Sequence, residues 1–226
     1  MDIPAKLVKE LRELTNAGFS DCRAALIEAA AQLGDSADHK KLIEKAVDVL
    51  RKRGQAAAAK KATREASEGL IGHYIHAGGK IGVIVEINCE SDFVARTDAF
   101  KTLCHDVAMH IAAVDPRYVR REDVTQEMLE HEKEIYTAQA RATGKPEPVI
   151  QKIVQGKMEK FYEETCLYEQ HYIKDETQTI GEMIAQAIAK LGENITIRRF
   201  SRYKVGEVSV TAAAGSVAEE TPTTAG

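Results

Sequence analysis

The feature that most constrains this fold is a single β-hairpin pattern among segments whose periodicity is helical. Residues 70–76 and 81–88 are rich in apolar side chains, and Ala77-Gly78-Gly79-Lys80 lies between them. Glycine pairs readily adopt the positive φ angles of tight hairpin turns, so the two runs should pair as antiparallel strands. The second run is β-branched and apolar on both faces, which predicts a central strand covered by a helix on at least one side.

The first part of the chain has helical periodicity. Residues 1–54 contain three amphipathic segments separated by turn signals, which predicts a three-helix docking module whose third helix ends at Gly54. Residues 55–68 are rich in alanine and basic side chains, and we expect a helical linker there. The chain should therefore begin with a small helical unit that is separate from the hairpin.

The remaining core is expected over residues 69–206. After the hairpin, an apolar stripe that ends before Pro116 predicts a helix covering the sheet. Two charged segments should then form a helical hairpin over about 125–174, followed by a helix closed by Gly192. A last strand should run over about 194–205. The fold class is therefore α+β, with a small antiparallel sheet of about three strands covered by helices.

The C-terminal part leaves one question of register open. Apolar residues of the last predicted strand alternate in one phase, but Phe200 falls in the other. Either a bulge resets the register or both faces of the strand are partly covered. Residues 207–226 are small and polar without apolar periodicity, which predicts a disordered tail.

Composition disfavours several functional classes. The 226 residues include 29% charged side chains and carry a formal net charge of −4, so no overall positive field favours a nucleic acid or an anionic membrane as the partner. The four cysteines have no paired spacing, and we find no leader segment and no long apolar run, so we expect a cytoplasmic protein with free thiols. Since neither zinc-ligand spacing nor a phosphate loop occurs, we expect no metal, no cofactor and no enzymatic activity.

An acidic and an aromatic residue stand together after the second strand of the hairpin. Asp92 and Phe93 lie within Glu86–Arg96, where an exposed ring would meet water. Exposed aromatic residues on rigidly held connections are frequent binding anchors, so the pair suggests a loop that enters a partner. The alternative is that Phe93 tucks under the following helix as an ordinary core residue.

A basic run gives the one argument for nucleic-acid binding. From Arg51 to Arg64 the chain carries six basic side chains and no acid. No aromatic side chain is interleaved for base stacking, and alanine with lysine is ordinary helix chemistry. A solvated helical linker is therefore the favoured interpretation. A nucleic-acid or ribosome-binding module, built on this run and on basic residues of the last strand, is the competing class.

Two motifs resemble signatures of the elongation factor Ts family. Residues 11–26, which begin Leu11-Arg12-Glu13-Leu14, resemble its N-terminal signature, and Glu86–Arg96 resembles its second one. The likeness extends to Gly192–Phe200 and covers residues 1 to about 206, in the shorter form with one copy of the α+β core. Ser91 stands where the family usually has Thr, and Arg23 where it has Lys; both changes keep the chemistry.

The resemblance implies a guanine-nucleotide exchange factor for the GTPase elongation factor Tu, with a UBA-like N-terminal module. The module would dock on the GTPase domain, and the Asp92-Phe93 loop would disturb its magnesium site. The contact residues implied at that site are Ser91, Asp92, Phe93 and Val94, and those implied in the module are Leu11, Arg12, Gly18, Phe19, Ser20, Asp21 and Arg23. The resemblance leaves the oligomeric state open between a monomer and a homodimer through the core sheet. A homodimer would lack the disulfide that some short members form, because Ser201 stands in place of the cysteine.

Overall fold

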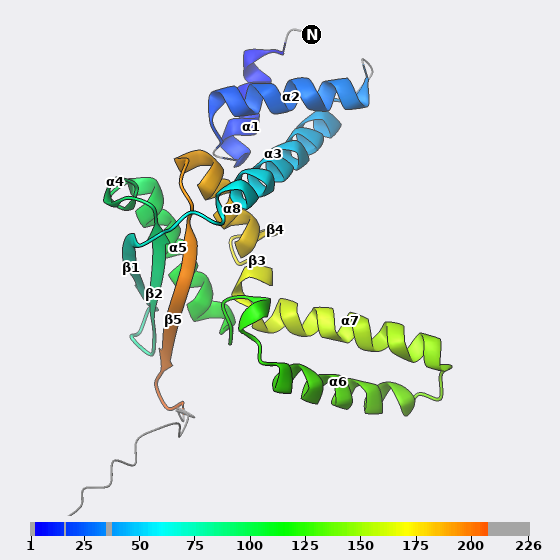
Figure 1. The fold of residues 1–226 in the computed structure, drawn as a ribbon. Coiled ribbons are helices and arrows are strands. Elements are labelled where there is room, and N and C mark those ends of the chain that lie inside the picture. The colour runs from blue at the N-terminus through cyan, green and yellow to red at the C-terminus, as the bar shows by residue number, and fades with distance from the viewer. Residues whose placement is uncertain (1–2, 16, 35–37, 208–226) are drawn as a thin grey trace, which may run out of the picture.

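The architecture is seen in a computed structural model, which describes residues 3–15, 17–34 and 38–207. The expected tail at 207–226 lies outside these ranges except for Glu207. Along the chain, N-terminal helices are followed by a three-stranded antiparallel sheet with its covering helices, and a helical hairpin projects to one side (Figure 1). The fold is α+β, as the sequence predicts.

Three helices form the N-terminal module: α1 (Ala5–Thr15), α2 (Phe19–Leu33) and α3 (His39–Lys61). Their apolar stripes face one another because residues three and four apart share one side of a helix. The resulting core consists of Ile3, Leu7, Val8, Leu11, Cys22, Ala25, Leu26, Ala29, Ala30, Ile43, Ala46 and Val49. The three predicted helices are confirmed.

The prediction that the third helix ends at Gly54 is wrong. α3 runs through Gly54 to Lys61, so the module and half of the predicted linker share one continuous helix. Gly54 is buried where α3 packs on α8 (Ile180–Leu191), and a Cβ placed on it would lie 3.6 Å from the backbone of Ala185. The glycine therefore marks the close approach of two helices and not a helix end.

The sheet has the strand order β1-β2-β5 and is antiparallel throughout. β1 (Glu68–Ile75) and β2 (Ile81–Cys89) form the predicted hairpin, with Gly78 and Gly79 in its turn at φ angles of 90° and 68°. β5 (Thr196–Lys204) pairs with the other edge of β2. The central position of β2 explains its continuous apolar composition.

A bulge in β5 resolves the open question of register. The residue opposite Ile87 is Ile197, whereas the preceding residue of β2 lies opposite Arg199, which leaves Arg198 as the extra residue. The extra residue returns Phe200 to the same face of the sheet as Ile197. Of the two alternatives, the bulge is the one observed.

α5 (Asp98–Val114) covers the inner face of the sheet, and α8 contributes apolar side chains to the same core. α5 packs on β1 and β2, as its apolar stripe predicts. α8 contacts α5 and also packs along α3, so the long helix of the module rests on the core. The largest fully buried side chains of this core include Ile87, Phe100 and Ile111.

The helical hairpin is formed by α6 (Gln126–Arg141) and α7 (Glu147–Thr165) and projects away from the sheet (Figure 1). The prediction that its second helix reaches residue 174 is wrong. α7 ends at Thr165 because Cys166 is extended and fully buried, and because the amide of Leu167 donates to the carbonyl of Tyr118 at 2.9 Å. Tertiary contacts thus end the helix where its periodicity alone would continue.

Short elements connect the long ones. They are α4 (Asp92–Ala95) and η1 (Arg121–Asp123), then η2 (Leu167–Glu169), β3 (His171–Tyr172) and β4 (Asp175–Thr179). β3 and β4 pair as a small antiparallel hairpin that the sequence analysis does not predict. Its second strand leads directly into α8.

Candidate partner-binding site

The acidic and aromatic pair opens a short helix directly after the central strand. β2 ends at Cys89, and α4 begins just beyond it at Asp92. Ser91 is the N-cap of α4, and its side-chain oxygen accepts a hydrogen bond from the Val94 amide at 3.3 Å. The predicted loop is therefore a helical turn, because a serine N-cap satisfies an amide that the start of a helix leaves free.

The exposure of Phe93 decides between the two alternatives for this residue. Its side chain is 79% exposed, more than any other large hydrophobic side chain in the described residues. Val94 and Ala95, the next residues of α4, are 7% and 3% exposed and belong to the main core. Phe93 therefore does not tuck under the following helix, and α4 has one side in the core and one side in water.

Asp92 lies on the exposed side of α4. Its carboxylate forms an ion pair with Arg96 at 2.6 Å, and both side chains are mostly exposed. Exposed ion pairs contribute little to stability because water screens them. A cation on a partner could therefore replace Arg96 at small cost.

Ser91 and Val94 do not share this exposure. The Ser91 hydroxyl donates to the carboxylate of Glu193 at 2.6 Å, so the side chain is turned toward the protein. Val94 is a core residue that is 7% exposed, so in the free chain its side chain offers a partner little surface. Of the four residues implied at this site, Asp92 and Phe93 are the two that face solvent.

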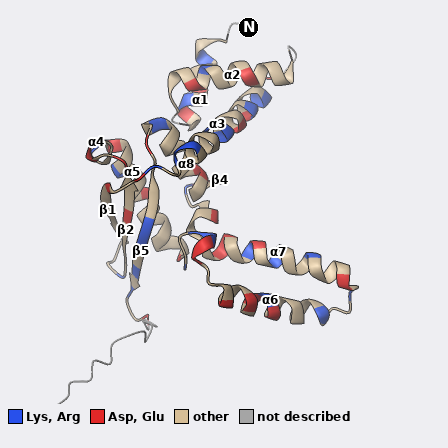
Figure 2. Ribbon diagram, viewed as in Figure 1, with Lys and Arg blue, Asp and Glu red and all other residues tan. Residues whose placement is uncertain are grey.

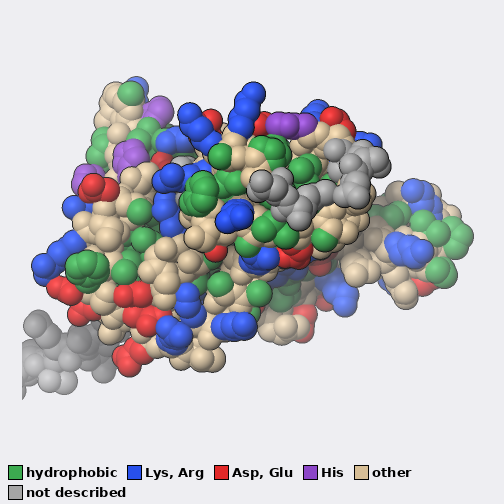
Figure 3. Space-filling model, turned by 90° about the horizontal axis from the view of Figure 1, so that it is seen from above, with side chains coloured by type: hydrophobic (Ala, Val, Ile, Leu, Met, Phe, Trp, Pro, Cys, Tyr) green, Lys and Arg blue, Asp and Glu red, His purple; other side chains and the backbone are tan. Residues whose placement is uncertain are grey.

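The N-terminal module presents a second exposed surface. Leu11 is fully buried in the module core, so in the free chain its side chain offers a partner no surface. Leu14, near the end of α1, is 63% exposed, and Phe19 is 53% exposed. In the view from above, hydrophobic side chains lie exposed between basic ones (Figure 3). The other implied residues of the module are also exposed: Arg12, Gly18, Ser20, Asp21 and Arg23.

The basic run, which lies on α3 except for Arg64, is partly neutralised by acids of the same chain. Figure 2 colours the ribbon by charge, and the charged positions of α3 are mostly basic, with acidic ones in its first half. The ion pairs are Arg51–Glu182 at 3.5 Å, Arg53–Glu28 at 2.6 Å and Arg64–Glu90 at 3.5 Å. Because half of the run is engaged in this way, the structure favours a helix face with paired charges over a phosphate-binding patch.

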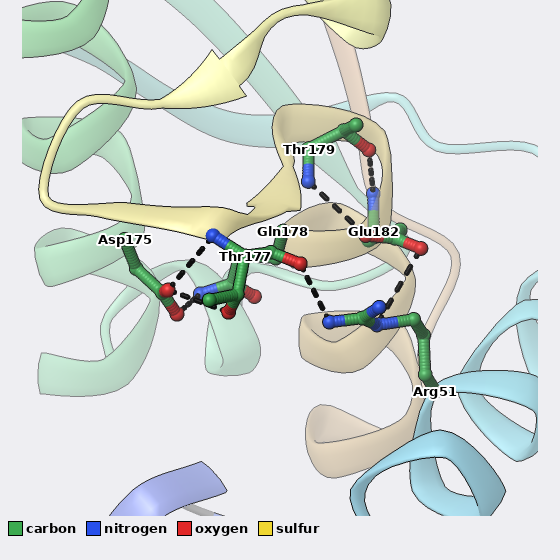
Figure 4. Close-up of polar contacts among 6 residues, drawn as sticks. All are labelled: Arg51, Asp175, Thr177, Gln178, Thr179 and Glu182. Carbon is green, nitrogen blue, oxygen red and sulfur yellow. Dashed lines mark hydrogen bonds and ion pairs between the residues drawn. The ribbon is translucent and has the colours of Figure 1, made fainter.

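A polar network attaches α3 to the core (Figure 4). Arg51 donates from Nη2 to the carbonyl of Thr177 at 2.7 Å, and its Nε forms an ion pair with Glu182 at 3.5 Å. Glu182 also forms a capping box with Thr179, since each side chain accepts a hydrogen bond from the other residue's amide. Asp175 accepts two hydrogen bonds from Thr177 within β4, the strand that leads into α8. The network therefore fixes α3 against the start of α8.

Among the described residues, no group of three or more His, Cys, Asp and Glu side chains could hold a metal ion. Within the same ranges, none of the helices combines the length and the apolar character needed to span a bilayer. His110 is a fully buried core residue whose Nε2 lies 3.1 Å from the side-chain oxygen of Gln170.

Comparisons with known proteins agree with the two motifs. The family model for elongation factor Ts matches residues 5–207. Elongation factor Ts of Koribacter versatilis (strain Ellin345) is 60% identical over 220 residues, which cover 97% of this chain and 96% of that protein. Elongation factor Ts of Geobacter metallireducens (strain ATCC 53774 / DSM 7210 / GS-15) is 56% identical over 207 residues, covering 92% of this chain and 91% of that protein. These matches span the module, the sheet and α4, and the chain belongs to the elongation factor Ts family.

Proposed function

We propose that this chain promotes the release of GDP from elongation factor Tu, and that α4 inserts Asp92 and Phe93 beside the magnesium site of that GTPase. The observation that carries the proposal is the exposure of Phe93 in a member of the elongation factor Ts family. Its ring is 79% exposed in α4, the short helix that follows the central strand. Burying such a ring in a partner is favourable, and aromatic anchors supply much of the binding energy in protein interfaces.

The proposed mechanism acts on the metal ion and not on the nucleotide itself. Magnesium neutralises the phosphates of GDP, so weakening its coordination raises the free energy of the bound nucleotide. Contacts of α4 that form only as the nucleotide leaves would lower the barrier to release. Each tenfold in release rate requires about 1.4 kcal/mol of barrier. The chain itself would perform no chemical step, and its place of action would be the cytoplasm, where elongation takes place.

The N-terminal module would supply affinity for the GTPase domain. Its exposed surface combines the apolar side chains of Leu14 and Phe19 with the charges of Arg12, Asp21 and Arg23. Because α3 is continuous and packs on α8, this surface and α4 belong to one connected body. A ligand with two prearranged contact surfaces loses less entropy on binding than one with flexibly linked surfaces.

Stopped-flow release of fluorescently labelled GDP from elongation factor Tu tests the proposal. The wild-type chain should accelerate release, and Phe93→Ala should lower the accelerated rate at saturation by about tenfold or more. Its free energy of unfolding in urea should fall by less than about 1 kcal/mol, compared with about 3–5 kcal/mol for truncation of a core Phe.

Ile173→Ala is the matched control for this experiment. Ile173 lies in the turn between β3 and β4, is 39% exposed, and belongs to neither proposed contact surface. Its truncation should leave GDP release unchanged. Unimpaired release by Phe93→Ala, or a loss of stability typical of a core residue, would contradict the insertion of α4.

We also propose that two copies of the chain associate through the outer face of the sheet, which points away from α5. Five large apolar side chains on this face are more than half exposed: Ile71, Ile75, Ile84, Tyr203 and Val205. A second copy offers the same apolar surface, as a two-fold symmetric interface requires. Ser201 pairs with Ile84 on this face, so association would involve no disulfide there.

Sedimentation equilibrium tests this association. Ile84→Lys should raise the dissociation constant of the dimer at least tenfold. A wild-type chain that has the mass of a monomer at every concentration would contradict the proposal.

A further inference from the structure

The connection between α8 and β5 carries an acid that reaches the start of α4. Gly192 ends α8 in the left-handed conformation at a φ of 81°, and Glu193 follows it. The Glu193 carboxylate accepts three hydrogen bonds: from the Ser91 hydroxyl at 2.6 Å, from the Ser91 amide at 3.0 Å and from the Glu90 amide at 3.1 Å. All three donors belong to the two residues immediately before α4.

The chemistry of these groups fixes the orientation of the Ser91 side chain. An ionised carboxylate can only accept hydrogen bonds, so the proton of the Ser91 hydroxyl must point at Glu193. A lone pair of the same oxygen is then free to accept from the Val94 amide at 3.3 Å, which is the N-cap hydrogen bond of α4. Glu193 thus holds the backbone before α4 and also sets the cap that starts it.

A second set of contacts joins the same two chain segments, and here the donor lies beside Glu193 and the acceptor lies before α4. Glu90 accepts from the Asn194 amide at 2.6 Å and forms an ion pair with Arg64 at 3.5 Å. The Asn194 side chain donates to the carbonyl of Arg64 at 2.8 Å. These contacts therefore join three segments just before α4 begins: the residues after β2, the connection between α8 and β5, and the chain that leaves α3.

We propose that Glu193 is a positioning residue for nucleotide exchange, which acts by holding α4 in the orientation that presents Asp92 and Phe93 to the GTPase. This inference rests on the proposed function of α4. A helix of one turn has too few hydrogen bonds to define its own direction, so its orientation depends on contacts from outside. A displacement of about 1 Å is enough to reduce a rate strongly when the contacts must form in one geometry.

Glu193→Gln tests the proposal because it keeps the size of the side chain and removes the charge. In the free chain, the amides of Glu90 and Ser91 should exchange hydrogen faster, whereas amides of α5 should be unchanged. With elongation factor Tu, the maximal rate of GDP release should fall about tenfold while the half-saturating concentration changes less than about twofold. Glu169→Gln is the matched control, since Glu169 forms a 2.8 Å ion pair with Arg121 at the base of the helical hairpin, far along the chain from α4.

A double-mutant cycle separates positioning from general destabilisation. If Glu193 acts through α4, Glu193→Gln should reduce release much less in the Phe93→Ala background than in the wild type, because the ring that it positions is already absent. Full additivity of the two losses, an equal loss from Glu169→Gln, or an unimpaired maximal rate for Glu193→Gln would overturn the positioning role. A wild-type chain that does not accelerate release would instead overturn the proposed function, and this inference with it.

Discussion

Neighbouring residues of α4 have opposite environments, and this difference defines the candidate site. Phe93 is 79% exposed and Val94 is 7% exposed, since successive residues of a helix point about 100° apart and α4 has one side in the core. The sequence indicates the acidic and aromatic pair but not the burial of the residue beside it. Glu193 could not be predicted either, because it lies 102 residues from Ser91 and no local pattern marks the contact.

His110 leads to a prediction about pH at the scale of one residue. Burial lowers the pKa of His110, so the folded chain holds the imidazole neutral, with Gln170 beside one nitrogen and Tyr172 against the ring. In the unfolded chain the same imidazole takes up a proton below about pH 6.5, so the free energy of unfolding should fall as the pH drops below that value. The slope contributed by this group is at most about 1.4 kcal/mol per pH unit.

Urea unfolding between pH 7.5 and pH 5 measures this slope. The control is His110→Gln, which has no titrating group at this position and should lose less stability over the same range. Parallel curves for the wild type and His110→Gln would show that His110 does not contribute to the pH dependence.

At the scale of elements, local periodicity located the helices and tertiary contacts set their ends. The β-hairpin, the helix that covers it and the helix of the capping box were predictable because each has a local pattern of apolar residues, caps and glycines. The predicted ends of α3 and α7 were wrong for related reasons. α3 continues through Gly54 because this part of the helix packs on α8, and Thr165 precedes a segment bonded to distant residues 118 and 119. Neither contact leaves a signal in the nearby sequence.

Alanine substitutions at two buried glycines should change the free energy of unfolding in opposite directions. Gly54→Ala should raise the free energy of unfolding by about 0.5–1 kcal/mol, because alanine favours the helix and its Cβ would make ordinary contacts at 3.6 Å. Gly72→Ala should lower it by about 1–3 kcal/mol, because its Cβ would lie 2.9 Å from Cys104 Cβ and 3.1 Å from the Cys104 carbonyl oxygen. Urea unfolding of both variants checks the signs, and destabilisation by Gly54→Ala would show that α3 and α8 pack more tightly than described.

At the scale of the whole molecule, α3 is the element that joins the two proposed contact surfaces. Its first half completes the module core, and its second half packs along α8. The sequence predicts the order and class of these units, because periodicity reports on each unit alone. It does not predict that they share a helix, because the contact between α3 and α8 joins distant parts of the chain.

Arg51→Ala tests whether this connection matters for binding. The variant loses the hydrogen bond to Thr177 and the ion pair to Glu182, while the apolar cluster of the module is unchanged. We expect the half-saturating concentration in GDP release to rise by about tenfold, with a smaller change in the maximal rate. Lys52→Ala, which changes the adjacent exposed basic residue, is the control. Equal effects of the two variants would indicate that charge, and not attachment of the module, determines affinity.

The four cysteines give the chain internal reporters of local opening. Cys22 lies in the module core, Cys89 and Cys104 lie in the sheet core, and Cys166 lies at the base of the helical hairpin. Burial raises the pKa of all four thiols, that of Cys104 to about 12, so the folded chain holds little reactive thiolate at neutral pH. A thiol reagent can therefore modify each cysteine only after its own cluster opens, and the order of modification ranks the local stabilities of the three units without any added label.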